Sequence, residues 1–254
     1  TDPLNHYLSV QSVIAGTGPG LVWVDDPLSP RSVFVRAPEG FHLVGDPGNE
    51  ALAREVARFY CEEVIPDGRR LGWRYSCLHY WPREWEGVIR PVLGALSPSW
   101  GYQRFLLLDS LRVDWRTLLP DGYELVRADA ELLNGSVQGA EAIDGWGFWS
   151  MEDFLQNGFS FCVLQGKSIV SRCTSDCVVG RRAEVGIYTA PDHRGKGLAT
   201  AAVAAAVEHC LQRGIDHIGW HCWSPNEASF RTARRVGFEH VLDHYGLEVW
   251  MNAQ

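Results

Sequence analysis

Apolar residues in the first 120 positions recur with the two periods expected of strands and helices. Between residues 21 and 46 the apolar runs are short and are separated by turn-forming segments rich in Asp, Ser, Pro and Gly. We therefore predict three strands there, over residues 21–24, 32–35 and 41–44. Helical spacing follows, with Asn49 placed to cap a helix of residues 50–64 that Pro66 and Gly68 would end. An aromatic strand, a second helix and a last strand are predicted over residues 73–85, 88–96 and 102–108.

A second series of elements begins after the turn-forming residues 119–122. We place a domain boundary there, which divides the chain into domains of residues 1–120 and 121–254. Strands are predicted in the second domain over residues 123–126, 159–164, 169–173, 183–189, 215–220 and 246–251. Two helices are predicted, over residues 197–213 and 227–235, and Gly214 is placed to end the first of them.

Composition and charge exclude several classes of protein. With 46% hydrophobic and 21% charged residues, the chain is typical of a soluble globular protein, and no run of 18 apolar residues indicates a membrane span. The first residues lack the pattern of a secretory signal, so a cytoplasmic protein is expected. The formal net charge of -8 repels phosphate backbones, so nucleic acid is not an expected partner. The same charge mildly favours a cationic substrate such as an amine.

The cysteines do not form a metal-binding pattern. Most of the seven lie in apolar runs, which favours buried, reduced thiols. Cys173 and Cys177, even with His221 and Cys222, lack the spacing of zinc ligands, and no metal site is predicted.

Residues 183–200 combine a strand, a tight turn and a helix start with the chemistry of a phosphate cradle. Alternation along the strand places Glu184, Gly186 and Tyr188 on one face. The turn Arg194-Gly195-Lys196-Gly197 then enters a helix whose first amides are free and carry the positive end of the helix dipole. Glycines let these amides approach an anion closely, and the two basic side chains add positive charge. The turn by itself is equally consistent with a helix that begins at a basic, glycine-rich segment without a ligand.

The flanking residues resemble the GNAT superfamily, the Gcn-five-related N-acetyltransferases. The cofactor motif of that superfamily is Arg/Gln-x-x-Gly-x-Gly/Ala, and Arg194, Gly197 and Ala199 stand at its positions. Asn226 followed by Gly237-Phe238 matches the family's next helix. The resemblance covers about residues 121–251 and implies an α+β fold on a mixed sheet, with acetyl-CoA as cofactor. Further likeness to the group that includes zwittermicin A resistance acetyltransferases lies in residues 154–159, 185–189 and 193–200, and reaches residues 22–25.

The resemblance implies roles for the residues around the turn. Ile187, Tyr188 and Thr189 would bond the pantetheine arm of the cofactor. The pyrophosphate would be held by Arg194 and the amides of Gly195, Lys196, Gly197, Leu198, Ala199 and Thr200. Asn226 would bond the pantetheine or its loop, although an asparagine that only caps a helix has the same sequence pattern.

Acetyl transfer in such enzymes is direct, within a ternary complex. Glu184 stands about where many members place the general base, although a solvated or salt-bridged glutamate is the alternative. His221, at the end of the next strand, is the rival base. Ala233 occupies the position where the family usually has a tyrosine that protonates the leaving thiolate. Tyr245, Tyr188 or another donor would then serve, or the thiolate would leave unprotonated.

Two questions stay open at this level. Residues 1–120 repeat the order of elements without the cofactor turn, which favours a degenerate acetyltransferase-like domain over an unrelated α+β substrate-binding domain. The function is an N-acetyltransferase of a small-molecule amine or, because of Ala233, a non-catalytic coenzyme A-binding or sensor module. Trp146, Trp149, Trp220 and Trp223 fit core packing better than an acceptor pocket. The acceptor and the oligomeric state are not defined by the sequence.

Overall fold

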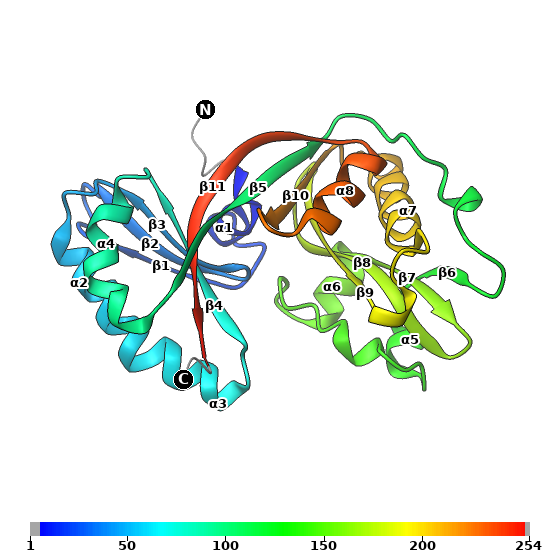
Figure 1. Ribbon diagram of the computed structural model, residues 1–254, viewed down its shortest axis with the longest axis horizontal. Coiled ribbons are helices and arrows are strands. Elements are labelled where there is room, and N and C mark those ends of the chain that lie inside the picture. The colour runs from blue at the N-terminus through cyan, green and yellow to red at the C-terminus, as the bar shows by residue number, and fades with distance from the viewer. Residues whose placement is uncertain (1–5, 252–254) are drawn as a thin grey trace. The chain divides into compact units, whose positions relative to one another are not determined.

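The computed structural model describes residues 6–251 and divides them into two compact units (Figure 1). Unit 1 comprises residues 20–103 and 243–251, and unit 2 comprises residues 6–19 and 104–242. This division differs from the predicted boundary at residue 120. Two long strands, β5 (Ser99–Leu108) and β11 (Phe238–Trp250), each contribute residues to both units. A local turn signal shows where an element ends, but it cannot show which sheet a strand will join.

Unit 1 is built on a mixed sheet in the order β1-β2-β3-β4-β11. The first four strands are β1 (Leu21–Val24), β2 (Ser32–Ala37), β3 (Gly40–Gly45) and β4 (Tyr75–Trp81). Neighbouring strands are antiparallel except β3 and β4, which are parallel and stay in register from Phe41↔Leu78 to Val44↔Trp81. Residues 246–250 of β11 pair with residues 75–79 of β4, so the sheet continues from β4 to β11.

Helices link the parallel strands of unit 1, as a parallel pair requires. A continuous helical segment consists of α2 (Glu50–Phe59), the π-helical turn η2 (Tyr60–Val64) and α3 (Ile65–Leu71). The prediction that Pro66 ends the helix was wrong: Pro66 lies in the first turn of α3, where its missing N–H costs no hydrogen bond. The segment ends at Gly72, whose φ of 74° is left-handed. With α4 (Trp85–Leu93), these helices bury an apolar core that includes Tyr60, Trp85 and Ile89.

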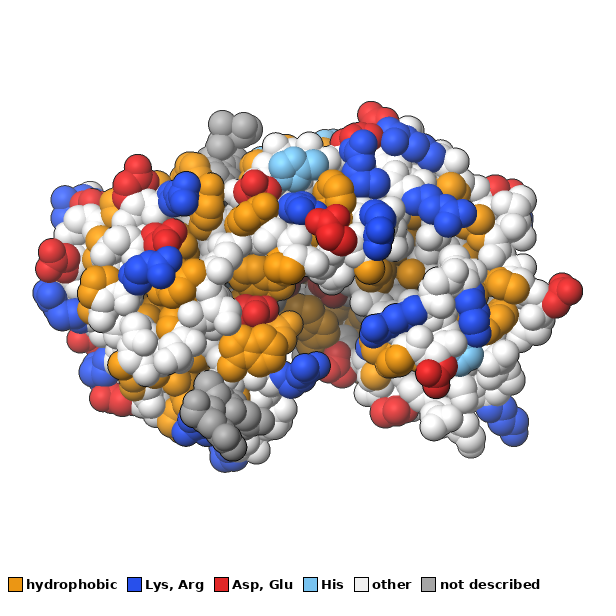
Figure 2. All heavy atoms as spheres, in the orientation of Figure 1, with side chains coloured by type: hydrophobic (Ala, Val, Ile, Leu, Met, Phe, Trp, Pro, Cys, Tyr) orange, Lys and Arg blue, Asp and Glu red, His pale blue; other side chains and the backbone are white. Residues whose placement is uncertain are grey.

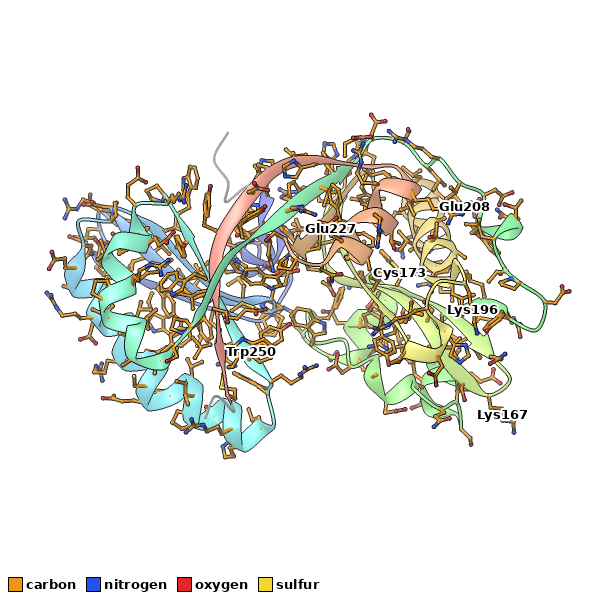
Figure 3. The ribbon with its side chains drawn as sticks, viewed as in Figure 1. Lys167, Cys173, Lys196, Glu208, Glu227 and Trp250 are labelled. Carbon is orange, nitrogen blue, oxygen red and sulfur yellow. The ribbon has the colours of Figure 1, made fainter. Side chains whose placement is uncertain are left out.

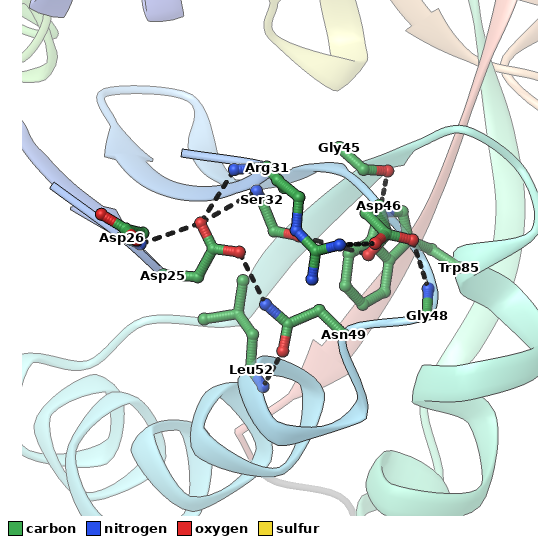
Figure 4. Close-up of polar contacts among 10 residues, drawn as sticks. All are labelled: Asp25, Asp26, Arg31, Ser32, Gly45, Asp46, Gly48, Asn49, Leu52 and Trp85. Carbon is green, nitrogen blue, oxygen red and sulfur yellow. Dashed lines mark hydrogen bonds and ion pairs between the residues drawn. The ribbon is translucent and has the colours of Figure 1, made fainter. Parts of the chain in front are cut away.

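Side chains of the protein itself occupy the turn between β3 and α2 (Figure 4). The Asn49 side chain caps α2 by accepting a hydrogen bond from the Leu52 amide at 3.0 Å. Asp46 accepts from the Gly48 amide at 2.9 Å, and the second oxygen of Asp25 accepts from the Asn49 side chain at 3.0 Å. The other oxygen of Asp25 accepts from three backbone amides, those of Asp26, Arg31 and Ser32.

The strands of unit 2 belong to the same 11-stranded sheet, which continues from β11 in the order β5-β10-β9-β8-β7-β6. The other strands of unit 2 are β6 (Glu124–Arg127), β7 (Ser160–Gln165), β8 (Ser168–Val179), β9 (Arg182–Thr189) and β10 (His217–Trp223). The four strands β6 to β9 are antiparallel, whereas β9 and β10 are parallel. The predicted α+β fold with a mixed sheet is confirmed.

Helices cover both faces of this part of the sheet. On one face, α7 (Leu198–Gln212) packs on β7, β8 and β9, and α8 (Glu227–Val236) packs beside it. The core between them includes Leu106, Val185, Val203 and Trp220, all buried. The short helix α1 (Leu8–Ile14), which sequence periodicity did not reveal, contacts β8 and β9. A third cluster under α5 (Ala130–Asn134) and α6 (Met151–Asn157) packs around Phe154.

The surface carries charges of both signs. Figure 2 shows acidic and basic side chains interspersed over the face in view rather than gathered into one basic patch. Six of the seven cysteines are buried, and Cys61 is exposed. None of the helices in residues 6–251 has the length and apolar character needed to cross a membrane.

Candidate active site

The predicted phosphate cradle is an exposed turn at the start of α7. Gly195 and Gly197 have φ angles of 76° and 81°, in the left-handed region that favours glycine. Gly197 is the N-cap residue, and no side chain within the described part of the chain caps the helix. The amides of residues 198–200 therefore stand at the positive end of a 15-residue helix without a capping acceptor.

Basic side chains surround this turn and are held in place by neighbours. Arg194 donates from Nε to the carbonyl of Thr189 at 3.2 Å. Lys196 donates from Nζ to the hydroxyl of Tyr123 at 3.1 Å, and that hydroxyl lies 3.1 Å from Nδ1 of His193. Figure 3 labels Lys196 at the start of α7 and Glu208 near its other end. A β-carbon added at Gly195 would meet no atom within 4 Å, so the turn is open to a ligand. These residues fit a diphosphate.

Strands β9 and β10 diverge next to this turn. Their parallel register covers only Arg182↔His217, Ala183↔Ile218 and Glu184↔Gly219. β9 then continues to Thr189 along β8, while β10 continues to Trp223. On the side that faces β10, the backbone of Ile187, Tyr188 and Thr189 therefore lies outside the parallel register of the two strands. The register thus shows that the two strands part after Glu184 and Gly219.

Glu184 and His221 meet where the pairing of β9 and β10 ends. Nδ1 of His221 and a carboxylate oxygen of Glu184 form a close hydrogen bond. The His221 side chain is only 7% exposed, and the Glu184 side chain is only 2% exposed. Tyr7 stacks on the His221 ring, with centroids 5.4 Å apart, and Phe105 lies at 4.8 Å. The two residues predicted as rival bases thus form one pair, and the carboxylate orients the imidazole.

The remaining predicted residues are divided between the units. Tyr188 lies on the Glu184 face of β9, is 43% exposed and stacks under the Arg172 guanidinium at 4.9 Å. Asn226 caps α8 by accepting from the Ser229 amide at 3.1 Å, which leaves its side-chain nitrogen as a donor. Tyr245 belongs to unit 1, where the guanidinium of Arg83 lies 4.5 Å above its ring. It is not among the residues that unit 2 gathers around Glu184.

Ala233 and Trp220 lie in the core of unit 2, whereas two other tryptophans do not pack in a core. Ala233 is fully buried, so no hydroxyl at this helix position serves the site. Trp220 is buried, and its Nε1 donates to the hydroxyl of Ser229 at 3.1 Å. Trp146 and Trp149 are 42% and 61% exposed, so the expectation of core packing was wrong for them.

Sequence reasoning missed an acidic residue beside this site. A bulge in β8 inserts Asp176 between Ser175, opposite Val185, and Cys177, opposite Glu184. The Asp176 carboxylate lies over Gly186, where an added β-carbon would be 2.9 Å from both of its oxygens. A bulge has no reliable sequence signal; a glycine inside the predicted strand was the only indication of a close approach.

Three buried thiols of unit 2 are poor candidates for a nucleophile. Burial raises the pKa of the Cys173 thiol well above its ordinary value and raises the pKa of Cys210 to about 12. Burial also raises the pKa of Cys222. Because the thiolate is the nucleophilic form, a raised pKa disfavours attack by these three cysteines.

Comparisons with known proteins agree with this geometry. The GNAT acetyltransferase family model matches residues 4–246, and the chain belongs to this family. It is 30% identical over 241 residues to the uncharacterized N-acetyltransferase YdfB of Bacillus subtilis, which covers 92% of this chain and 87% of that protein. The chain is therefore an acyltransferase, and the cosubstrate of GNAT acetyltransferases is acetyl-CoA.

Solved structures share the fold at lower identity. A GCN5-related N-acetyltransferase-like protein from Streptococcus suis has a TM-score of 0.68 at 22% identity, with 93% of this chain and 90% of that chain covered. A tandem GNAT protein from the clavulanic acid biosynthesis pathway has a TM-score of 0.55 at 13% identity, with 96% and 87% covered. At these identities the likeness concerns the fold alone.

Proposed function

We propose that this protein transfers an acetyl group from acetyl-CoA to a primary amine of a small molecule, directly and within a ternary complex. The observation that carries the proposal is the meeting of three features in unit 2. They are an uncapped glycine turn at the start of α7, the divergence of β9 from β10, and the Glu184–His221 pair where that divergence begins.

The cofactor would lie along the opening between β9 and β10. The backbone of Ile187, Tyr188 and Thr189 supports a role in bonding the pantetheine arm, with the Asn226 side-chain nitrogen as a further donor. The amides of residues 195–200, with Arg194 and Lys196, support pyrophosphate binding. Acetyl-CoA supplies the activated thioester, and a main-chain amide of the diverging strand would stabilise the oxyanion.

The Glu184–His221 pair would remove the proton that an ammonium group must lose before attack. The amine nitrogen then forms a bond to the carbonyl carbon, and the carbon–sulfur bond breaks. Of the two protons lost from nitrogen, one ends on the thiol and one in solvent. Because Glu184 fixes the orientation of His221, the pair would act as one base rather than as two alternatives.

The acid that protonates the thiolate would not be the family tyrosine, since Ala233 is buried in the core. Tyr188 is the candidate within unit 2, because it lies within the proposed pantetheine segment of β9 and its side chain is partly exposed. Tyr245 stays a prediction. A small-molecule acceptor agrees with the likeness to the zwittermicin A resistance group, which is part of the proposal and does not define the acceptor.

Unit 1 would be a degenerate acetyltransferase-like unit. Its antiparallel strands lead to β3, a helix and the parallel strand β4, the same order as β9, α7 and β10 in unit 2. In the sheet, β4 lies beside β11, which comes from the second half of the chain. Likewise β10 lies beside β5, which comes from the first half. The tandem GNAT neighbour supports this view. No cofactor is proposed for unit 1, because its side chains occupy the corresponding turn.

Titration calorimetry with acetyl-CoA, followed by thiol release with a panel of amines, tests the function. We expect binding of one acetyl-CoA per chain and release of free thiol that depends on the amine. The Glu184→Gln variant should lose about 10²- to 10⁴-fold in kcat while its affinity for acetyl-CoA stays unchanged. Unchanged turnover in this variant would contradict the role of Glu184 in the base. An absence of acetyl-CoA binding would contradict the proposed function as a whole.

Thiol release also tests the alternative of a non-catalytic coenzyme A sensor, which Ala233 favours. A protein that binds acetyl-CoA tightly but turns over no amine would support the sensor. Glu208→Gln serves as the matched control, since Glu208 pairs with Arg116 on the solvent side of α7. It removes one carboxylate from the same unit without touching the site.

A further inference from the structure

The bulge in β8 places a carboxylate at the entrance of the proposed active site. Strand alternation puts Glu184, Gly186 and Tyr188 on one face of β9, and Asp176 covers Gly186 on that face. Gly186 is the second residue after Glu184, which corresponds to about 7 Å along a strand. The Asp176 carboxylate therefore lies one step beyond the Glu184–His221 pair.

Two glycines allow this placement. A β-carbon at Gly186 would lie 2.9 Å from both carboxylate oxygens, so any side chain there would displace the Asp176 carboxylate. A β-carbon at Gly147 would lie 1.6 Å from the Asp176 carbonyl oxygen, so the loop before α6 packs directly on the bulge. Gly186 and Gly147 thus leave the space that the carboxylate and the backbone of Asp176 occupy.

The location relative to the cofactor opening gives this carboxylate a chemical role. Gly186 belongs to the part of β9 that has left its register with β10. Because Glu184 lies on the same face of β9, an amine that the Glu184–His221 pair deprotonates would bind on this face. Most aliphatic amines reach an enzyme near neutral pH as ammonium ions, and a carboxylate is their natural hydrogen-bonding partner. Arylamines are neutral at this pH and gain much less from such a contact.

We propose that Asp176 binds the ammonium group of the acceptor and places it next to the Glu184–His221 pair. This contact would make aliphatic primary amines the acceptor class. This proposal rests on the proposed function, because the Glu184–His221 pair must deprotonate the bound ammonium group. Asp176 is an acceptor-binding residue in this scheme, and the proton is removed by the Glu184–His221 pair. The net charge of -8 agrees with a cationic acceptor.

The test compares benzylamine, an ammonium ion at neutral pH, with aniline, its neutral near-isostere. We expect wild-type protein to acetylate benzylamine in preference to aniline. In Asp176→Asn, KM for benzylamine should rise about 10- to 100-fold, as expected for loss of a charge-assisted hydrogen bond. KM for aniline and the affinity for acetyl-CoA should change less than about twofold. Asp176→Glu should restore part of the loss.

A second variant keeps the charge of Asp176 but displaces its carboxylate. Gly186→Ala should raise KM for benzylamine in the same direction, because its β-carbon takes the place of the carboxylate. Asp121→Asn removes one exposed acidic charge from unit 2 and should leave every constant unchanged. Circular dichroism confirms that each variant is folded.

Calorimetry with benzylammonium chloride and free coenzyme A separates this proposal from the catalytic one. Binding of benzylammonium that depends on Asp176 but leads to no turnover would support the acceptor site and overturn the catalytic function. Turnover of benzylamine that is unaffected in Asp176→Asn would overturn the acceptor site and support the catalytic function. Failure of the wild-type protein to bind benzylammonium would also overturn the acceptor site.

Discussion

The helix that follows β9 and the helix that follows β3 begin in opposite ways. In unit 2, α7 starts at Gly197 without a side-chain cap and with Arg194 and Lys196 beside it. In unit 1, α2 starts at Asn49, whose side chain caps the helix (Figure 4). The same order of strand, turn and helix thus presents free amides in one unit and satisfied amides in the other.

The strands differ in the same sense. β3 and β4 remain paired up to Val44 and Trp81, close to the end of both strands. β9 and β10 separate after Glu184 and Gly219, and β9 runs on for five more residues. The proposed cofactor site therefore combines two departures from regular structure, a helix start without a side-chain cap and a parallel pair that ends early. Unit 2 has both, and unit 1 has neither.

Cutting the chain at the boundary predicted from sequence should have the largest effect. A fragment of residues 121–254 lacks β5, and with it Leu106 and Leu108 from the core of unit 2. Loss of two buried leucines costs about 4–10 kcal/mol, comparable with the whole stability of a domain, about 5–15 kcal/mol. We expect no cooperative thermal unfolding of this fragment by circular dichroism. A fragment that unfolds cooperatively would contradict the shared strands.

Copying the acidic turn of unit 1 into unit 2 should abolish the difference between the helix starts. Gly195→Asp places a carboxylate shortly before the N-cap of α7, as Asp46 is placed before the N-cap of α2, and aspartate tolerates a left-handed φ better than most residues. We expect the acetyl-CoA Kd from calorimetry to rise about 100-fold or more through charge repulsion and loss of donors. Gly166→Asp, at an exposed hairpin glycine with φ of 60°, is the matched control and should bind normally.

Removing the cap of α2 should affect stability and leave ligand binding unchanged. Asn49→Ala deprives the Leu52 amide of its acceptor and should lower the free energy of unfolding by about 1 kcal/mol. Urea denaturation measures this change. The acetyl-CoA Kd of the variant should equal that of the wild type, because α2 belongs to the unit without a cofactor turn. A weaker Kd would show that unit 1 contributes to binding.

The smallest effect concerns the pH dependence of the same turn. Hydrogen bonds from backbone amides, above all from Ser32, lower the pKa of Asp25 below its ordinary value of 3.8. A lowered pKa means that the stabilisation is present above pH 3.8 and is lost as the pH falls through the folded-state value. Asp25→Asn should therefore show a flatter dependence of its unfolding midpoint between about pH 2 and 5. Parallel curves for variant and wild type would contradict this.

The sequence predicted the elements of the fold well because each has a local signal. The strands near 21–44 and 183–189, and the helices that begin at Asn49 and Gly197, follow from apolar period, caps and glycine turns. Two features carried no such signal. The helical segment passes through Pro66 because a π-helical turn precedes it, and α1 is too short for its period to be counted.

The candidate site was predicted in part for the same reason. The cradle lies within seven consecutive residues, so its chemistry can be inferred from the chain itself. Glu184 and His221 were recognised as separate candidates, yet their contact depends on the register of β9 and β10. Asp176 was missed because a bulge changes which face a residue occupies, and strict alternation cannot show this.

The two strands shared between the units also have a consequence for biosynthesis. The part of the sheet in unit 1 includes residues 246–250 of β11, which are synthesised after every other described strand of both units. Most of unit 1 is made earlier, when β4 still lacks this neighbour. Completion of unit 1 is thus coupled to synthesis of β11, and a nascent chain without β11 leaves this part of the sheet unfinished.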